Sequence, residues 1–269
     1  MTRLPTLFVS HGSPMLALEP GTTGPVLTKV GERLPRPKAI LVISAHWLTH
    51  QPTLSSSKAP ETIHDFGGFP RALYSLQYPA PGSPELAAQV QAMLKNIGLE
   101  AKLDEHRGLD HGAWVPLRYL YPQADIPVVQ LSLNPSVPPK LQFALGQFLQ
   151  SLSSEGVLIL ASGSFTHNLG ELYWDQPEES PEAGDPYVDQ FRDWMIDKIE
   201  QHDVEAINDY RKLAPHARRA HPTDEHLLPL FVALGAADNK EVLRLHKDVA
   251  LGTLAMDLFA FGSGTQLLA

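Results

Sequence analysis

The sequence contains no cysteine among its 269 residues. This absence excludes disulfide bonds, iron–sulfur clusters, thiolate zinc sites and a cysteine nucleophile. Any metal that the chain binds must therefore be held by nitrogen and oxygen atoms. The sequence has 12 histidines, so imidazole nitrogen is the first ligand type to consider.

Long apolar runs and an excess of basic residues are also missing. No stretch approaches the roughly 18 unbroken apolar residues of a membrane span, so we expect no membrane partner. The formal net charge of −9 argues against a nucleic-acid partner, because phosphate binding favours a basic surface. A strand candidate begins within the first ten residues and leaves no room for a signal peptide, so we expect a cytoplasmic protein.

No Gly-x-Ser-x-Gly motif surrounds Ser10, Ser13 or Ser44, so a serine hydrolase is not supported. Hydrophobic residues make up 43% of the chain and charged residues 19%, which is typical of a globular protein. The length allows one large hydrophobic core, and we find no repeat or interdomain linker. We therefore expect a single domain over residues 1–269.

Three continuous apolar runs predict strands that are covered on both faces. They occupy residues 6–10, 39–43 and 157–161. Helical spacing predicts helices over residues 84–96 and 139–153 and from Pro186 onward, and further strands are expected at 100–103, 127–133, 241–246 and 253–261. Alternating strands and helices predict an α/β fold with a mostly parallel or mixed central sheet flanked by helices.

Three segments carry more specific expectations. Residues 50–84 are rich in Pro, Ser and Gly, and a loop of this length is typical of a lid or binding loop. A helix is expected to begin at Pro229 and to leave His226 in the loop before it. The helix over 139–153 is expected to bury one apolar face, formed by Leu141, Leu145, Phe148, Leu149 and Leu152.

Each of the three buried runs is followed by a histidine. His11 and His46 follow the first two runs closely, and His167 follows the third after five further residues. The carboxyl ends of parallel strands meet at one edge of a sheet, where ligands bind. A lone histidine at such a place often bonds only a backbone carbonyl. Together, these histidines predict a metal site with imidazole ligands at the carboxyl ends of the strands.

The third ligand is not fixed by this pattern, since Glu225 and His226 are both plausible. A catalytic zinc site and a facial triad of non-heme iron each need three protein ligands. His221 is a weaker candidate because it lies beside two arginines. His167 suits two roles, that of a further ligand and that of a general base.

Other polar residues keep two interpretations each. His111 either binds substrate or dioxygen, or only holds its own turn. The pair His64 and Asp65 either supports a site residue or closes its loop. Three arginines are candidates for binding a substrate carboxylate, and nothing distinguishes them: Arg71, Arg107 and Arg118. Five histidines are assigned to the surface or to packing: His50, His106, His202, His216 and His246.

Six segments together resemble the class III extradiol ring-cleavage dioxygenases, and within them the 4,5-DOPA dioxygenase branch. They are SHGSP at 10–14, SAHW at 44–47, IHDFGGFP at 63–70, GLDHGAW at 108–114, SGSFTHNL at 162–169 and PTDEH at 222–226. The resemblance implies a single-domain α/β fold with a divalent metal held by His11, His46 and His226. It also implies that His167 lies close to the metal, as base or additional ligand. Protocatechuate-type relatives use two histidines and a glutamate, which Glu225 would match.

The resemblance further implies the reaction and its cofactor. A catechol such as L-DOPA would bind Fe(II) through both oxygens, and a base such as His167 would remove one proton. Dioxygen would take an open position, and the ring would be cut beside the diol. Zn(II) held by the four histidines would be a plausible ion in a crystal, but it cannot pass electrons to dioxygen.

Two other functions stay open on the sequence. A zinc-dependent hydrolase would use the same histidines to activate water, with His167 or Glu225 as base. A non-enzymatic binding protein could keep the fold without the reaction. The partners expected are a small aromatic diol and dioxygen, and the oligomeric state is not predicted.

Overall fold

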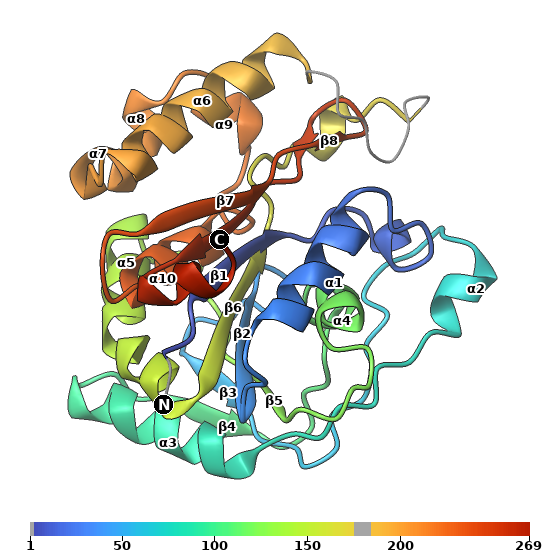
Figure 1. Ribbon diagram of the computed structural model, residues 1–269, viewed down its shortest axis with the longest axis vertical. Helices are drawn as coiled ribbons and strands as arrows, with labels where there is room; N and C mark the ends of the chain where they lie inside the picture. Colours follow the sequence, from blue (N-terminus) through green and yellow to red (C-terminus); the bar gives the residue numbers. More distant parts are fainter. Residues whose placement is uncertain (1–2, 175–183) are drawn as a thin grey trace.

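A six-stranded mixed sheet forms the centre of the structure, a computed structural model that describes residues 3–174 and 184–269 (Figure 1). The strand order is β5 (Val128–Gln130), β2 (Ala39–Ser44), β6 (Val157–Gly163), β1 (Thr6–Ser10), β10 (Leu258–Phe261) and β7 (Val242–His246). The first four strands are parallel, while β10 runs antiparallel to β1 and β7 antiparallel to β10. The predicted α/β class with a mixed sheet is confirmed.

Successive residues of the central strands point into two separate hydrophobic cores. Phe8 belongs to one core and its neighbours Leu7 and Val9 to the other. The same alternation holds in β2 and β6, because neighbouring side chains of a strand project from opposite faces. Both faces are therefore covered, which explains why these strands are continuous apolar runs in the sequence.

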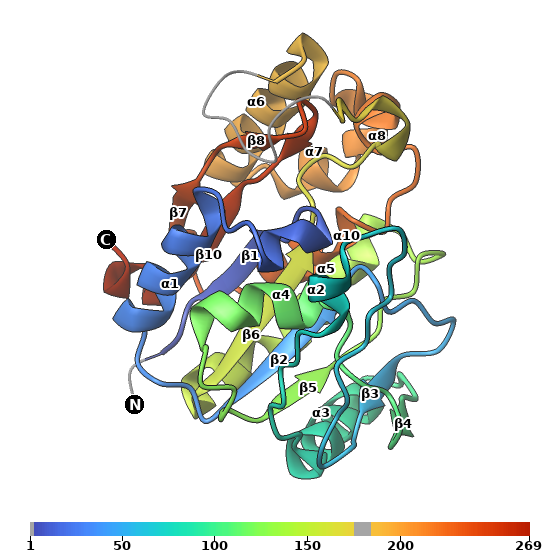
Figure 2. The ribbon, with the colours of Figure 1, turned by 90° about the vertical axis from the view of Figure 1, so that its right-hand side faces the viewer.

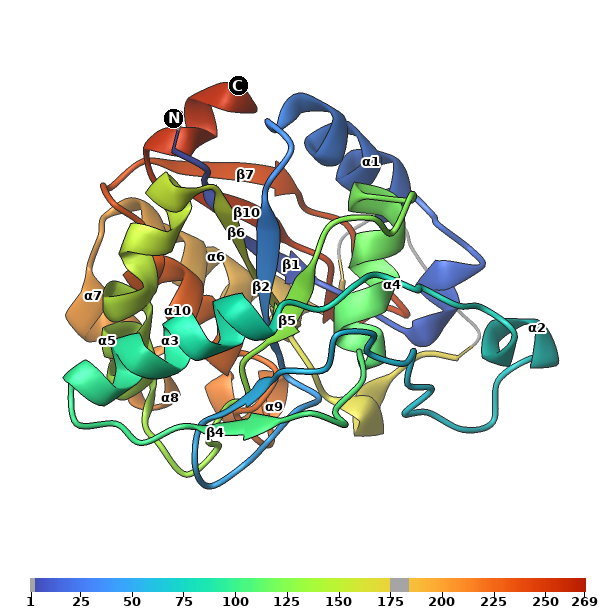
Figure 3. The same ribbon diagram turned by 90° about the horizontal axis from the view of Figure 1, so that it is seen from below.

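Helices cover the two faces unequally (Figures 1 and 3). One face carries α1 (Thr23–Arg33) and α4 (His111–Leu120), and the other carries α3 (Pro84–Asn96), α5 (Pro139–Leu149) and α10 (Leu228–Ala236). Four more helices extend this second side: α6 (Pro186–Glu200), α7 (Val204–Asn208), α8 (Tyr210–Leu213) and α9 (Ala217–Ala220). Short 3-10 turns are η1 (Pro14–Ala17), η2 (Gln150–Glu155), η3 (Leu169–Glu171) and η4 (Ser263–Leu267).

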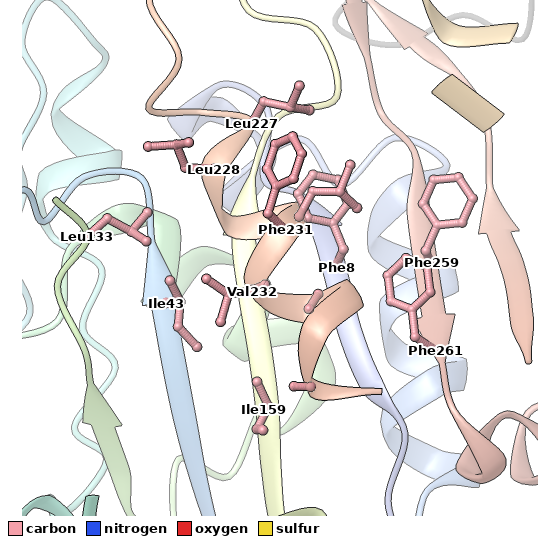
Figure 4. Packing of buried hydrophobic residues seen from close by; sticks show 14 of the residues in the cluster. Phe8, Ile43, Leu133, Ile159, Leu227, Leu228, Phe231, Val232, Phe259 and Phe261 are labelled. Carbon is pink, nitrogen blue, oxygen red and sulfur yellow. The ribbon is translucent and has the colours of Figure 1, made fainter. Parts of the chain in front are cut away.

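Helix α10 lies directly on the sheet, with Phe231 and Val232 over the strands that carry Phe8, Ile43 and Ile159 (Figure 4). It is buried almost along its whole length. The helix begins at Leu228 with Pro229 in its first turn, so His226 precedes it as expected.

The predicted buried face of the helix over 139–153 is confirmed for Leu149 and Leu152, which are buried, and wrong for Leu141 and Phe148. Leu141 and Phe148 are 54% and 46% exposed, while Gln142, Gly146 and Leu149 are buried. The reason is the close approach of α10, since a Cβ added at Gly146 would lie 2.2 Å from the carbonyl oxygen of Val232. The side of α5 that carries Gly146 and Leu149 therefore faces the protein, and Leu141 and Phe148 face outward.

Several predicted strands are shorter or pair elsewhere. The strand expected at 100–103 is β4 (Lys102–Asp104), which pairs with β3 (Thr53–Ser55) in a separate two-stranded sheet. Only the end of the segment 253–261 joins the central sheet as β10. The residues before it form a hairpin of β8 (Val249–Ala250) and β9 (Leu254–Ala255).

The long segment 50–84 contains β3 and one short helix, α2 (Arg71–Tyr74), and is otherwise irregular. Figure 2 shows this part of the chain beside α4. It is attached there by hydrogen bonds from the Trp114 indole to Ile63 O (2.9 Å) and from Ile63 N to Leu109 O (2.7 Å). Throughout the described ranges, we find no helix whose length and hydropathy suit a bilayer crossing.

Candidate metal centre

Five histidines line one cavity of about 310 Å³ at the carboxyl ends of the central strands. His11 directly follows β1, His46 lies two residues after β2, and His167 lies four residues after β6. The other two are His111, the first residue of α4, and His226, which precedes α10. The structure therefore brings every predicted site residue into one place.

Three imidazole nitrogens converge in this cavity. The Nε2 atom of His46 lies 2.9 Å from Nε2 of His11 and 3.3 Å from Nε2 of His226. Ligands about 2.1 Å from one ion and at right angles lie about 3.0 Å apart. Both distances from His46 are close to this value, so His46 shares a position suited to one metal ion with His11 on one side and with His226 on the other.

Neighbouring side chains extend this cluster. Ligand atoms that lie within 4.8 Å of one another form two groups, and the contact between His46 and His226 joins them. The groups are His11 with His46 and His111, and His167 with Glu225 and His226.

The hydrogen bonds of Ser162 determine the tautomer of His11. The Ser162 hydroxyl donates its one hydrogen to the carbonyl of Gly112 at 2.5 Å. It must then accept from Nδ1 of His11, which lies 3.0 Å away. The proton of His11 is thus on Nδ1, and Nε2 presents a lone pair to the cavity.

Asp110, a residue that sequence reasoning did not select, organises the backbone around His46. Its fully buried carboxylate accepts hydrogen bonds from Ser44 Oγ (2.6 Å), Gln130 Nε2 (2.8 Å) and Arg107 (2.9 Å). Ser44 Oγ in turn accepts from the backbone N–H of His46 at 3.2 Å. Asp110 also caps α4, and this N-cap position was the signal in the sequence that could have identified it.

His226 owes its position to a glycine in β6. A Cβ added at Gly163 would lie 2.1 Å from the carbonyl oxygen of His226. The same oxygen accepts from Ser164 N at 2.8 Å. Glu225 lies 3.5 Å from Nδ1 of His226, the ring nitrogen opposite the one that faces His46, and its carboxylate is also near His167.

The imidazole of His167 stacks on that of His226, with ring centroids 3.4 Å apart and an interplanar angle of 7°. Burial lowers the pKa of His167 to about 4, although the charge of Glu225 opposes this shift. Burial, together with the nearby His111, also lowers the pKa of His46 to about 4. Burial holds the pKa values of His11 and His226 well below the usual range. Four imidazoles are therefore neutral at pH 7, as metal binding requires.

Asp65 fixes the orientation of His111. Its Oδ1 atom accepts from the backbone N–H of His111 at 2.9 Å and from Nδ1 of the same residue at 3.0 Å. Burial raises the pKa of Asp65, but the hydrogen bonds from His111 outweigh it and bring the pKa to about 2. Asp65 is thus an anion that supports a site residue, while His64 closes the loop through Leu76 O at 3.0 Å.

The remaining candidates lie elsewhere. Within the described part of the chain, none of the histidines assigned to surface or packing lines the cavity, and neither does His221. His221 is buried and bonds the carbonyl of Phe165 at 2.9 Å, and burial lowers its pKa to about 3. The three candidate arginines are also outside the lining among described residues, and Arg107 is paired with Asp110.

Fold and site together define an α/β protein with a histidine-rich centre suited to a metal ion. Residues 5–254 match the family described as the catalytic LigB subunit of aromatic ring-opening dioxygenase. The chain belongs to this family, and it is a metal-dependent extradiol ring-cleaving dioxygenase.

Named relatives agree with this assignment and cover nearly the whole chain. The chain is 41% identical over 266 residues to a 4,5-DOPA dioxygenase extradiol of Beta vulgaris, covering 96% of each protein. It is 41% identical over 260 residues to the protein of the same name from Escherichia coli K12, covering 95% of this chain and 93% of the relative. A crystal structure of an uncharacterized protein from Escherichia coli K12 superposes with a TM-score of 0.82 at 34% identity, covering 97% of this chain and 100% of the other. The resemblance inferred from the six segments is confirmed.

Proposed function

We propose that the protein opens the ring of a catechol at the bond beside the diol, using Fe(II) held by His11, His46 and His226. The proposal rests on the Nε2 atom of His46, which lies 2.9 Å from Nε2 of His11 and 3.3 Å from Nε2 of His226. When bound, Fe(II) supplies a redox-active centre with open positions that links catechol to dioxygen, which zinc cannot do. Three histidine ligands on one face of the ion leave its remaining coordination positions open.

His167 is proposed as the base that takes a proton from the catechol. The lone pair of an imidazole nitrogen lies in the plane of its ring. Because the rings of His167 and His226 are stacked and nearly parallel, one ion cannot lie in both planes at bonding distance. His226 binds the ion, and His167 is left to accept a proton. The lowered pKa of His167 means that it is unprotonated before substrate enters.

His111 is proposed to hold a polar group of the substrate or dioxygen beside the metal site. Its ring centroid lies 3.9 Å from that of His46, and Asp65 holds its Nδ1 proton. Nε2 of His111 is therefore the free nitrogen, placed to accept a hydrogen bond or a proton. Its position at the first turn of α4 makes it rigid, because Asp65 also binds its backbone N–H.

The test is metal loading followed by oxygen consumption. The purified protein is stripped of metal, loaded anaerobically with Fe(II) or Zn(II), and exposed to oxygen with catechol and with L-DOPA. L-DOPA is the first substituted catechol to try, since DOPA occurs in the names of the relatives. We expect oxygen uptake and a yellow ring-opened product with Fe(II) alone.

A matched control separates a specific site from general damage. His46→Ala is expected to lose both stoichiometric Fe(II) and turnover, and His50→Ala, at an exposed position outside the cavity, is expected to lose neither. An Fe(II)-loaded protein that holds one ion per chain and consumes no oxygen with any catechol would contradict the proposal.

A further inference from the structure

A small hydrophobic cluster, separate from the two cores of the sheet, covers part of the metal-site cavity. It is formed by Ala250, Leu251, Leu254 and Met256, with Leu172 packed against it. The first four side chains are at most 3% exposed. Leu251 and Leu254 come from the β8–β9 hairpin and line the cavity together with Leu172 and Trp174. The cavity therefore has a histidine part and an apolar part.

The hairpin is attached to the same short segments that carry the site histidines. Thr166, next to His167, donates from its hydroxyl to Thr253 O and accepts from Ala255 N, both at 2.7 Å. Met256 fits against Gly12, next to His11, where an added Cβ would lie 2.7 Å from the Met256 methyl. The apolar wall thus has a fixed position relative to the reacting centre.

Leu251 holds its place in this wall with an unfavourable backbone. Its φ angle is +48°, in the left-handed region that asparagine and glycine adopt more readily than leucine. Gly252 follows with φ +71° and contacts the ring of Tyr173, where a Cβ would lie 2.2 Å from a ring carbon. The tight turn of the hairpin thereby places the buried side chain of Leu251 at the wall of the cavity.

No lysine or arginine side chain lines the cavity among the residues that the structure describes. Arg219, on α9, is paired with Glu171 (2.7 Å) and Asp185 (3.6 Å). The chain segment 175–183 contains neither lysine nor arginine, and four of its nine residues are acidic. A carboxylate buried against the leucines would lack a basic partner, and such burial is costly.

We propose that the β8–β9 hairpin forms the pocket for the ring substituent, and that Leu251 and Leu254 select catechols with an uncharged, apolar substituent over catechols with a carboxylate. This inference rests on the proposed catechol cleavage and names the substrate class of the same site. The phenyl side chains of Phe66 and Phe69, which also line the cavity, extend the apolar surface.

The test compares 3-(3,4-dihydroxyphenyl)propanoate with its methyl ester, which lacks the negative charge and carries one additional methyl group. With the Fe(II) enzyme we expect kcat/KM for the ester to exceed that for the acid by about ten-fold or more, as expected for burial of an unpaired carboxylate. Calorimetry of the anaerobic enzyme should show the same order of Kd values without turnover. An acid that is turned over and bound as well as the ester would overturn the inference.

Unsubstituted catechol distinguishes a failure of the proposed function from a failure of the proposed substrate class. If it is also inert, the proposed function fails. If it is cleaved while the acid equals or exceeds the ester, only the substrate class fails. Dopamine and L-DOPA extend the comparison to a cation and a zwitterion, and we expect both to fall below the ester.

The variant Leu251→Asn tests the wall itself, because asparagine accepts the left-handed backbone and makes the wall polar. We expect the ester-to-acid ratio of kcat/KM to fall by about five-fold or more. The matched control is Leu213→Asn, at a leucine that is 54% exposed on α8, and it should leave the ratio unchanged. If Leu251→Asn does not fold, Leu172→Gln, at a half-buried member of the same wall, should lower the ratio. An unchanged ratio in a folded variant would overturn the role of the wall.

Discussion

The imidazole rings of His167 and His226 lie face to face, 3.4 Å apart between centroids and 7° from parallel. His167 follows the strand that ends at Gly163 and is half-buried, and His226 is buried in the loop before α10. This stacking gives the two imidazoles different roles. A metal ion bound by His11 and His46 can lie in the ring plane of only one of them.

Replacing His167 by Ala should abolish turnover while sparing metal binding. Loss of a general base typically lowers kcat by about 100-fold to 10,000-fold. Iron stoichiometry and the Kd for an inert catechol should stay close to those of the parent enzyme, and steady-state oxygen uptake should show the loss. A variant that loses its iron would show instead that His167 is an essential ligand.

Replacing Ser162 by Ala should weaken metal binding without unfolding the protein. The change removes the acceptor that holds the proton of His11 on Nδ1, so Nε2 is no longer kept free. Loss of such a supporting hydrogen bond typically costs about 10-fold to 100-fold in metal affinity. Competition with a metal chelator measures it. Ser153→Ala removes another buried hydroxyl remote from the site and should leave affinity unchanged.

Replacing Gly163 by Ala should displace His226, because the new methyl group would meet the carbonyl oxygen of that residue at 2.1 Å. We expect a large loss of bound iron and of activity, together with a lower melting temperature. Gly170→Ala is the matched control, since an added Cβ there would lie no closer than 3.4 Å to a neighbouring atom and the residue is outside the cavity lining. Retention of full iron binding in Gly163→Ala would show that the loop before α10 can shift freely.

Metal-free protein should lose stability as the pH falls from about 6.5 towards 4. The pKa values of His46 and His167 are lowered to about 4 by burial and that of His221 to about 3. A histidine with a lowered pKa stabilises the fold fully above its unfolded value and progressively less below it. Each contributes a slope of about 1.4 kcal/mol per pH unit in that window.

Denaturant unfolding in the presence of a chelator, at several pH values, measures this slope. His221→Gln should reduce it, because glutamine can still donate to the carbonyl of Phe165 but does not titrate. His50→Gln, at an exposed position, should leave it unchanged. An equal slope in all three proteins would show that other groups dominate acid unfolding.

The features predicted correctly from the sequence are those that a local residue pattern determines. The apolar runs at β1, β2 and β6 identify buried strands, and the histidines after them identify one edge of the sheet. The exposure of Leu141 and Phe148 on α5 could not be predicted in this way. Its orientation depends on Gly146 meeting the backbone of α10, a contact between segments far apart in the sequence that leaves no periodic signal.

The supporting residues of the site were equally hard to find. In the sequence, Asp110 has only the features of a helix cap. The fold shows that its carboxylate also accepts hydrogen bonds from Ser44 and Arg107. Ser162 gains its role because β6 lies between β1 and β2, an order that the sequence does not state. Leu254 was predicted within the late strand over 253–261, and Leu251 was outside every predicted element. Their place in the cavity follows from the turn at Leu251.

The order β2-β6-β1 also has a mechanical consequence. Strands in a sheet are about 4.8 Å apart, so the backbones that carry His11 and His46 are separated by about 10 Å and reach across a middle strand. That middle strand ends in Ser162 and Gly163, small enough for the two imidazoles to meet above it. Hydrogen bonds and two packed faces make this span stiff. The repeat distance of the β-sheet therefore sets the gap that the side chains of His11 and His46 have to bridge.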